Sequence, residues 1–131
     1  MSGLAHTERV DEDGYRVITY DPPSEEVTEA AIREAARQYK RVFGERFAGV
    51  WLFGSRSRGD HRPDSDADLL VVLHNENPPH SESRLLCSVA NRVRDLFGVF
   101  VDGHTTTLAR LESSDDDFHF FIRTEGQRLD A

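Results

Sequence analysis

Apolar residues recur in this chain every three or four positions in two long segments. The first segment follows Ser24, a residue that can cap a helix whose first turn carries Glu25 and Glu26. The second begins at Ser81 and ends at Gly98. This spacing gives a helix one apolar face, so we expect two amphipathic helices. Their buried positions are predicted to be Ile32, Ala35, Tyr39, Val42 and Phe43 in the first helix and Leu86, Val89, Val93, Leu96 and Phe97 in the second.

Short unbroken apolar runs predict buried strands between and after these helices. The runs are Val50–Phe53, the latter part of Asp66–Val72, and Gly98–Asp102. Together with a terminal helix, the order helix, strand, strand, helix, strand, helix is typical of a small mixed β-sheet packed with helices. We therefore predict the α/β fold class.

The N-terminal end of the chain and one loop carry weaker signals. Residues 1–14 are polar and acidic without periodicity, which predicts a flexible segment before a single domain at residues 15–131. Tyr15–Tyr20 alternates enough to form a short strand or an extended arm. Asn75–Pro79 is rich in turn residues and predicts a loop.

The C-terminal part of the chain predicts two further helices. A short one is expected near Leu108–Leu111. The last begins at the acidic run Asp115–Asp117, because negative charge stabilises a helix N-terminus, and it has Phe118, Phe121 and Ile122 on one side.

Length and charge narrow the range of functions. A chain of 131 residues suffices for one core but not for an added substrate domain, so specificity for an acceptor must come from a partner or from a second subunit of a homo- or hetero-oligomer. The net charge of -8 argues against extended binding to nucleic acid, and hence against a template-directed polymerase.

The cysteine content and the hydropathy bear on the compartment. Cys87, the only cysteine, is expected on the apolar side of its helix; it allows no disulfide within the chain and favours a reducing, cytoplasmic compartment. No apolar stretch is long enough to span a membrane, and the N-terminus lacks the apolar core of a signal peptide.

Gly54 and Ser55 follow the first predicted strand and open a short predicted helix. Glycine permits a sharp turn there, and the unpaired amide groups of a helix start, together with the Ser55 hydroxyl, can point at a phosphate. Arg56 and Arg58 add positive charge. Taken alone, a Gly-Ser turn followed by arginines is also what a solvent-exposed helix start looks like.

Acidic residues on the next strand supply the complementary chemistry. Asp66 and Asp68 alternate, so both side chains emerge on one face, and two carboxylates this close repel unless a cation neutralises them. Mg²⁺, with Mn²⁺ as the alternative, binds carboxylates together with phosphate oxygens. Asp102 can complete a two-metal site if its strand pairs beside this one. It could also be an exposed charge at a strand end, and His104 we interpret as a surface histidine.

Gly54–Gly59 and Ser65–Leu69 resemble the signature of the DNA polymerase beta-like nucleotidyltransferase superfamily, most closely its minimal single-domain members (MNT type, MntA-like antitoxins). The resemblance covers Phe47–Thr107 and, weakly, Ile122–Leu129. It implies the nucleotidyltransferase fold, with a triphosphate at Gly54 and Ser55 and metal ions at Asp66, Asp68 and Asp102. In the family apolar residues often follow the third acid, whereas here Gly103 and His104 follow it.

The resemblance also implies an activity. Such proteins typically act as the antitoxin of a HEPN-domain toxin, to which they transfer AMP from ATP. We therefore expect a metal-dependent protein adenylyltransferase whose acceptor is a hydroxyl, by resemblance a tyrosine, on a HEPN-type partner. Two alternatives stay open: nucleotidyl transfer to a small molecule, as in antibiotic-modifying relatives, and a non-catalytic module that neutralises its partner by occlusion.

Overall fold

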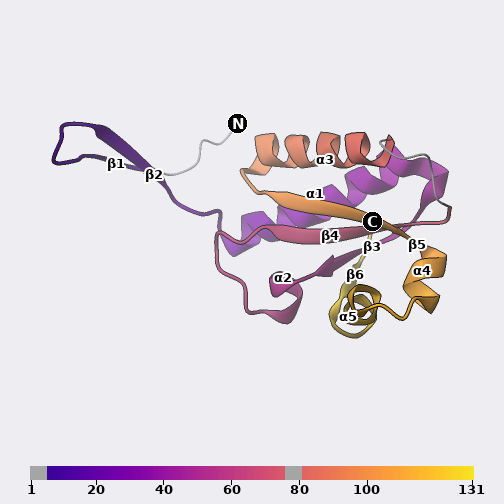
Figure 1. Ribbon diagram of the computed structural model, residues 1–131. Helices are drawn as coiled ribbons and strands as arrows, with labels where there is room; N and C mark the ends of the chain where they lie inside the picture. Colours follow the sequence, from indigo (N-terminus) through magenta and orange to yellow (C-terminus); the bar gives the residue numbers. More distant parts are fainter. Residues whose placement is uncertain (1–5, 76–80) are drawn as a thin grey trace.

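The computed structural model describes residues 6–75 and 81–131. A four-stranded mixed sheet in the order β5-β4-β3-β6 forms its centre. The predicted α/β class with a small mixed sheet is confirmed. Two long helices cover one face of the sheet and two short helices cover the other (Figure 1). The strands are β3 (Phe47–Phe53), β4 (Ala67–Leu73), β5 (Val101–Thr107) and β6 (Gln127–Leu129), and the covering helices are α1 (Glu25–Phe43), α3 (Ser81–Phe97), α4 (Leu108–Ser113) and α5 (Asp117–Glu125).

Strand β4 lies between β3, which is antiparallel to it, and β5, which is parallel. Leu69 and Val71 belong to the core beneath α1 and α3, while Leu70 and Val72 belong to the second core beneath α4 and α5. Because both faces of the strand are covered, its sequence is a continuous apolar run instead of an alternating one. The strand is thereby held at the centre of the sheet.

The two long helices form where the apolar spacing predicts them. In α1 the Ser24 side chain accepts a hydrogen bond from the Val27 amide, and four of the five predicted core positions are buried. In α3 two predictions are wrong. Leu96 lies in the last turn and is 60% exposed, since Val93 and Phe97 make the inward contacts there. Cys87 is exposed, because one residue of helix turns the side chain by about 100° from Leu86, which is partly buried against the core.

The N-terminal segment predicted to be flexible contains a strand. Residues His6–Val10 (β1) pair antiparallel with Arg16–Tyr20 (β2), the second of which matches the predicted strand or arm at Tyr15–Tyr20. This hairpin projects away from the sheet and helices (Figure 1). Residues 1–5, and 76–80 of the predicted loop, lie outside the described residues.

The remaining differences concern short or polar segments. A 3-10 turn, η1 (Gly44–Arg46), links α1 to β3, and a four-residue helix, α2 (Ser55–Arg58), follows β3. Strand β5 begins at Val101 and not at Gly98, and β6 at the sheet edge was not predicted. Over the described parts of the chain, no helix combines the length and the apolar character needed to cross a membrane.

Gly103 in β5 lies directly above a buried tyrosine. A Cβ at this position would be 2.7 Å from the hydroxyl oxygen of Tyr39 and 3.1 Å from Cδ2 of Leu86. The Tyr39 side chain is fully buried, and its hydroxyl has no hydrogen-bond partner among the described residues. Burial and the negative charge of Asp102 raise the pKa of Tyr39. Glycine at this position therefore lets β5 lie close to α1.

We expect Gly103→Ala to lower the free energy of unfolding by about 1–3 kcal/mol, because the added methyl overpacks the core. Tyr39→Phe alone should change it little, since the hydroxyl oxygen that it removes is unpaired. In the double variant the loss should be smaller than in Gly103→Ala. Urea denaturation of the four proteins measures this coupling, and strictly additive effects would contradict the proposed contact.

Candidate nucleotide and metal site

The parallel pairing of β4 with β5 sets Asp68 directly beside Asp102. His104, two residues further along β5, shares the face of Asp102. One ligand atom from each of these three side chains lies within 4.8 Å of the other two. The His104 Nε2 is 3.2 Å from the Asp102 Oδ2, and both side chains are about half exposed. The three residues form a cluster at the end of the sheet that is open to solvent.

Negative charge dominates this cluster. Burial, and then the charge of Asp102, raise the pKa of the Asp68 carboxyl, while His104 and Arg58 act in the opposite direction. Because the charged form of Asp68 is disfavoured here, a bound cation would relieve the repulsion. Two carboxylates are hard oxygen ligands that fit Mg²⁺ or Mn²⁺, and the imidazole adds a nitrogen ligand of the type that transition metals accept. The donor set therefore fits a divalent cation.

Gly54 brings the turn after β3 against the same carboxylate. Its φ is 74°, and a Cβ there would be 2.4 Å from the Asp68 Oδ2. Strand pairing places the preceding residue, Phe53, opposite Asp68. The chain then enters α2, where the Arg58 and Gly59 amides donate to the carbonyls of Gly54 and Ser55. The predicted phosphate-binding turn and the acid cluster thus meet at one end of the sheet.

Asp66 lies immediately before β4 and is exposed. Asp66 does not belong to the cluster of Asp68, Asp102 and His104, which is the group of possible metal ligands found among the described residues. Its charge still contributes to the raised pKa of Asp68. The Ala67 amide donates to the Phe100 carbonyl at 3.0 Å, which holds the chain between the two aspartates beside the start of β5.

The two arginines predicted to contact phosphate differ in their surroundings. The Arg56 guanidinium is buried and donates to the Ser65 carbonyl from Nε and Nη2, at 3.1 and 2.9 Å, and to the Pro63 carbonyl at 3.4 Å. Arg58 is exposed beside Asp60, at 3.3 Å. Arg56 therefore holds the loop that leads to Asp66, whereas Arg58 keeps its charge at the surface.

His104 is the residue of the cluster that the sequence analysis left out of the site. The signal was present, because strand periodicity puts a residue two positions after Asp102 on the same face. The residue type gave the contrary indication, since an isolated histidine without ligand spacing is more often a surface residue.

A comparison with protein families shows to which family this chain belongs. The model of the nucleotidyltransferase domain matches residues 32–121, more than half of the chain. The chain belongs to the nucleotidyltransferase domain family. This confirms the family resemblance carried by Gly54–Gly59 and Ser65–Leu69.

Solved structures support the same fold for this nucleotidyltransferase. One is the crystal structure of a toxin–antitoxin with AMP-PNP, at 20% sequence identity and a TM-score of 0.54, with 76% of this chain and 73% of that one covered. Another is a mutant of the toxin–antitoxin MntA–HpeT, at 21% identity and a TM-score of 0.51, with 79% and 72% covered. At these identities the likeness shows the shared fold. No curated protein matches the sequence.

The raised pKa of Asp68 predicts a dependence of stability on pH. A carboxyl whose folded pKa exceeds its unfolded value destabilises the folded state increasingly as pH rises through that interval, and the penalty is full above the folded pKa. In EDTA at pH 7, Asp102→Asn should therefore raise the free energy of unfolding, since it removes a charge that opposes ionised Asp68. This gain should disappear below the unfolded pKa of about 3.9.

A divalent cation should reverse the order of stability of the wild type and Asp102→Asn. With Mg²⁺ or Mn²⁺ at a hundred times its Kd, the wild type should gain about 2.7 kcal/mol, and Asp102→Asn less, because a ligand is lost. Urea denaturation with and without the metal measures both effects. Equal stabilisation of the two proteins would exclude Asp102 as a ligand.

Substitution of Arg56 and of Arg58 should affect stability to different extents. We expect Arg56→Ala to lower the free energy of unfolding by about 2 kcal/mol, because it leaves the part-buried carbonyls of Pro63 and Ser65 without their charged donor. Arg58→Ala, the matched exposed variant, should change it by less than about 1 kcal/mol. Thermal or urea denaturation distinguishes them, and similar losses in both variants would refute the assigned loop contact.

Proposed function

We propose that this nucleotidyltransferase is a metal-dependent protein adenylyltransferase, which transfers AMP from ATP to a hydroxyl on a partner protein. The observation that carries the proposal is the contact between Gly54 and Asp68. It sets a turn suited to phosphate against an acid cluster suited to a divalent cation. Nucleotidyl transfer needs these two features side by side, because the triphosphate is both substrate and metal ligand.

Each predicted site residue receives a role in this proposal. Gly54 and Ser55 hold the β- and γ-phosphates through the turn and the start of α2, with Arg58 supplying positive charge. Asp66, Asp68 and Asp102 hold Mg²⁺ or Mn²⁺, which would lower the pKa of the attacking hydroxyl and stabilise charge on the leaving pyrophosphate. Arg56 acts as a positioning residue through the loop before Asp66.

The chemistry is a single in-line displacement. The acceptor oxygen forms a bond to the α-phosphorus as the bond from the α-phosphorus to the bridging oxygen breaks, and pyrophosphate leaves. The acceptor proton passes to the Asp102 carboxylate, which lies on the exposed side of the cluster. Catalysis then rests on positioning and on charge neutralisation.

We propose a protein as the acceptor because the acid cluster is open to solvent, where a bulky substrate can reach it. The similar folds seen in toxin–antitoxin structures support a place as an antitoxin. We propose a HEPN-type toxin as the partner and one of its tyrosines as the acceptor, as the family resemblance implies. The cytoplasm, where the exposed Cys87 would stay reduced, is the compartment that suits this role.

Label transfer tests the proposal. ATP labelled at the α-phosphate, with Mg²⁺, should label a protein in an extract of the native host when wild-type enzyme is added. Asp68→Asn should reduce the labelling by at least about a hundredfold, because a metal-binding carboxylate is lost. Autoradiography of the separated proteins gives the measurement and identifies the acceptor.

Two controls make the result specific. ATP labelled at the γ-phosphate should label nothing in an enzyme-dependent way, since that phosphate leaves with pyrophosphate. Asp95→Asn, which removes an exposed carboxylate on α3, should label as the wild type does. Absence of protein labelling by an enzyme that binds ATP and metal would instead favour a small-molecule acceptor or neutralisation by occlusion.

A further inference from the structure

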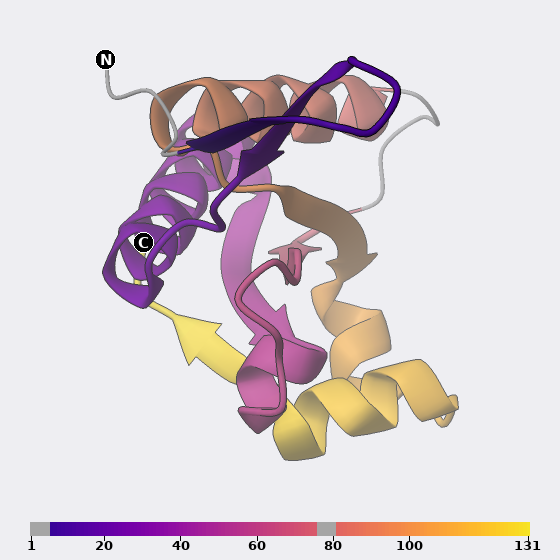
Figure 2. The same ribbon diagram turned by 90° about the vertical axis from the view of Figure 1, so that its left-hand side faces the viewer.

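A pocket of about 400 Å³ opens beside the phosphate-binding turn. Its walls combine apolar and polar residues from the end of β3, from α2 and from α5. Helix α5 lies beside α2 in both ribbon views (Figures 1 and 2). The volume is within the range of about 300–1,000 Å³ typical of small-molecule sites. The apolar lining residues are Phe53, Phe118, Phe121 and Ile122.

Two of these aromatic side chains remain substantially exposed, so burial in the core does not account for them. Phe118 is 40% exposed and Phe121 is 51% exposed, while Ile122 alone of the four is buried in the core. The Phe118 ring meets the Phe53 ring edge to face, with centroids 5.5 Å apart, and Phe53 in turn lies 5.7 Å from the ring of His104. A line of rings thus runs from α5 to the acid cluster. Exposed aromatic surface that continues into a polar site is typical of ligand binding.

The pocket lies on the side of the nucleotide donor and not of the acceptor. Gly54 and Arg58, which we assign to the phosphates, also line it. In an in-line displacement the acceptor enters opposite the leaving pyrophosphate, so its path lies away from the turn that holds that group. A pocket that shares residues with the turn is therefore placed to receive another part of the same triphosphate molecule.

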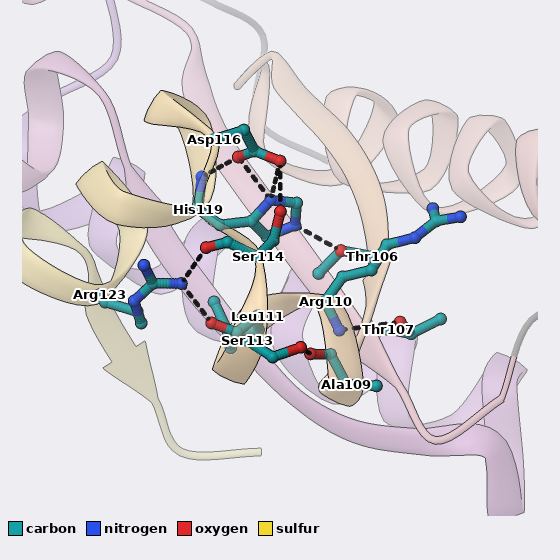
Figure 3. A network of polar contacts seen from close by, with 10 residues as sticks. All are labelled: Thr106, Thr107, Ala109, Arg110, Leu111, Ser113, Ser114, Asp116, His119 and Arg123. Atoms are coloured by element: carbon teal, nitrogen blue, oxygen red, sulfur yellow. Dashed lines mark hydrogen bonds and ion pairs between the residues drawn. The ribbon is translucent and has the colours of Figure 1, made fainter.

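A polar network holds α5 in the position that forms the pocket wall (Figure 3). His119 is buried; its Nδ1 contacts the Asp116 carboxylate at 2.7 Å, and its Nε2 contacts the Thr106 hydroxyl of β5 at 2.8 Å. Hydrogen bonds from Ser114 and from His119 lower the pKa of Asp116 to about 2. The helix is thereby tied to the strand that carries Asp102 and His104.

Arg123 ties the same helix to its neighbour. Its Nη1 donates to the carbonyls of Leu111 in α4 and of Ser114, at 2.7 and 3.0 Å (Figure 3). On the opposite side, the Ser57 hydroxyl of α2 donates to the Glu125 carbonyl. With contacts to β5, α4 and α2, the wall is held before any ligand arrives, which reduces the entropy lost on binding.

We propose that this pocket binds the purine base of the nucleotide donor, which stacks on Phe118 and Phe121. The inference rests on the proposed function, since it places the base of the same nucleoside triphosphate. Aromatic side chains bind bases through their π-faces, and the larger purine ring gains more contact than a pyrimidine. The charged groups at the rim are Arg58 and Glu125, whose side chains lie 4.0 Å apart. Because these two opposite charges lie beside each other, most of the selectivity for the base comes from stacking.

The test compares the binding of ATP and of inorganic tripolyphosphate, each with Mg²⁺, by calorimetry. Phe121→Leu keeps an apolar side chain but removes the ring, so the Kd for ATP should rise about tenfold while that for tripolyphosphate stays unchanged. Phe121→Trp should keep the wild-type affinity. Phe120→Leu is the matched control, because Phe120 lies on the same helix with the same 51% exposure but does not line the pocket.

Competition with the four nucleoside triphosphates gives a second readout. ATP and GTP should displace a bound labelled nucleotide at lower concentrations than CTP and UTP in the wild type, and this difference should shrink in Phe121→Leu. If Phe118→Leu and Phe121→Leu bind ATP as tightly as the wild type, the base lies elsewhere and the inference fails while the proposed function stands. If the wild type binds neither ATP nor tripolyphosphate, the proposed function fails and the inference with it.

Discussion

The register between β4 and β5 is the constraint on which the rest of this molecule depends. Asp68 and Asp102 lie side by side because the two strands run parallel in this one alignment. A shift of one residue would exchange the two faces of β4, placing Leu69 and Val71 where Leu70 and Val72 now pack. Burial on both sides therefore fixes the strand, and the strand fixes the acids. The chemistry of the site is a consequence of how the apolar core packs.

At two glycines the backbone comes close to a polar side chain. Gly54 lies against the Asp68 carboxylate, and Gly103 lies against the Tyr39 hydroxyl on the far side of the same pair of strands. Each glycine lets a polar group occupy space that a side chain would otherwise fill. The site is compact for this reason, and its negative charges lie close enough to oppose one another. The fold tolerates that repulsion because Asp102 is exposed, so cations can reach the cluster from solvent.

The extent to which the sequence predicted the structure follows from how local each signal is. The two long helices and strands β3 and β4 were predictable, because burial of one or two faces imposes a regular pattern on α1 and on Leu69–Val72. Strand β5 was placed too early, since its residues from Asp102 to Thr107 are mostly polar at the open edge of the sheet. Strand β6 has three residues and depends on a partner far away in the sequence.

Within the site, the sequence showed which residue types are present and how they are spaced, but not the surroundings of each side chain in the folded protein. Gly54, Asp68 and Asp102 could be selected from their spacing, and the structure brings them together at one end of the sheet. Arg56 could not be distinguished from Arg58, because only the folded chain shows which guanidinium faces the Ser65 carbonyl. The pocket beside α5 was unpredictable for a related reason: Phe118 and Phe121 follow helical spacing that is equally typical of a buried face.

Strand β6 is the last strand of the sheet to be synthesised, and this affects the order in which the chain can fold. β6 pairs with β3, and Gln127 at its start also donates to the Ser57 carbonyl in α2, next to the turn at Gly54. A ribosome that adds about 5–20 residues per second needs roughly 4–15 seconds to reach β6 after it has finished β3. During that interval one edge of β3 is unpaired and α5 is not yet available to form its wall. A nascent chain can thus assemble the acid cluster first, and only afterwards the surface beside it.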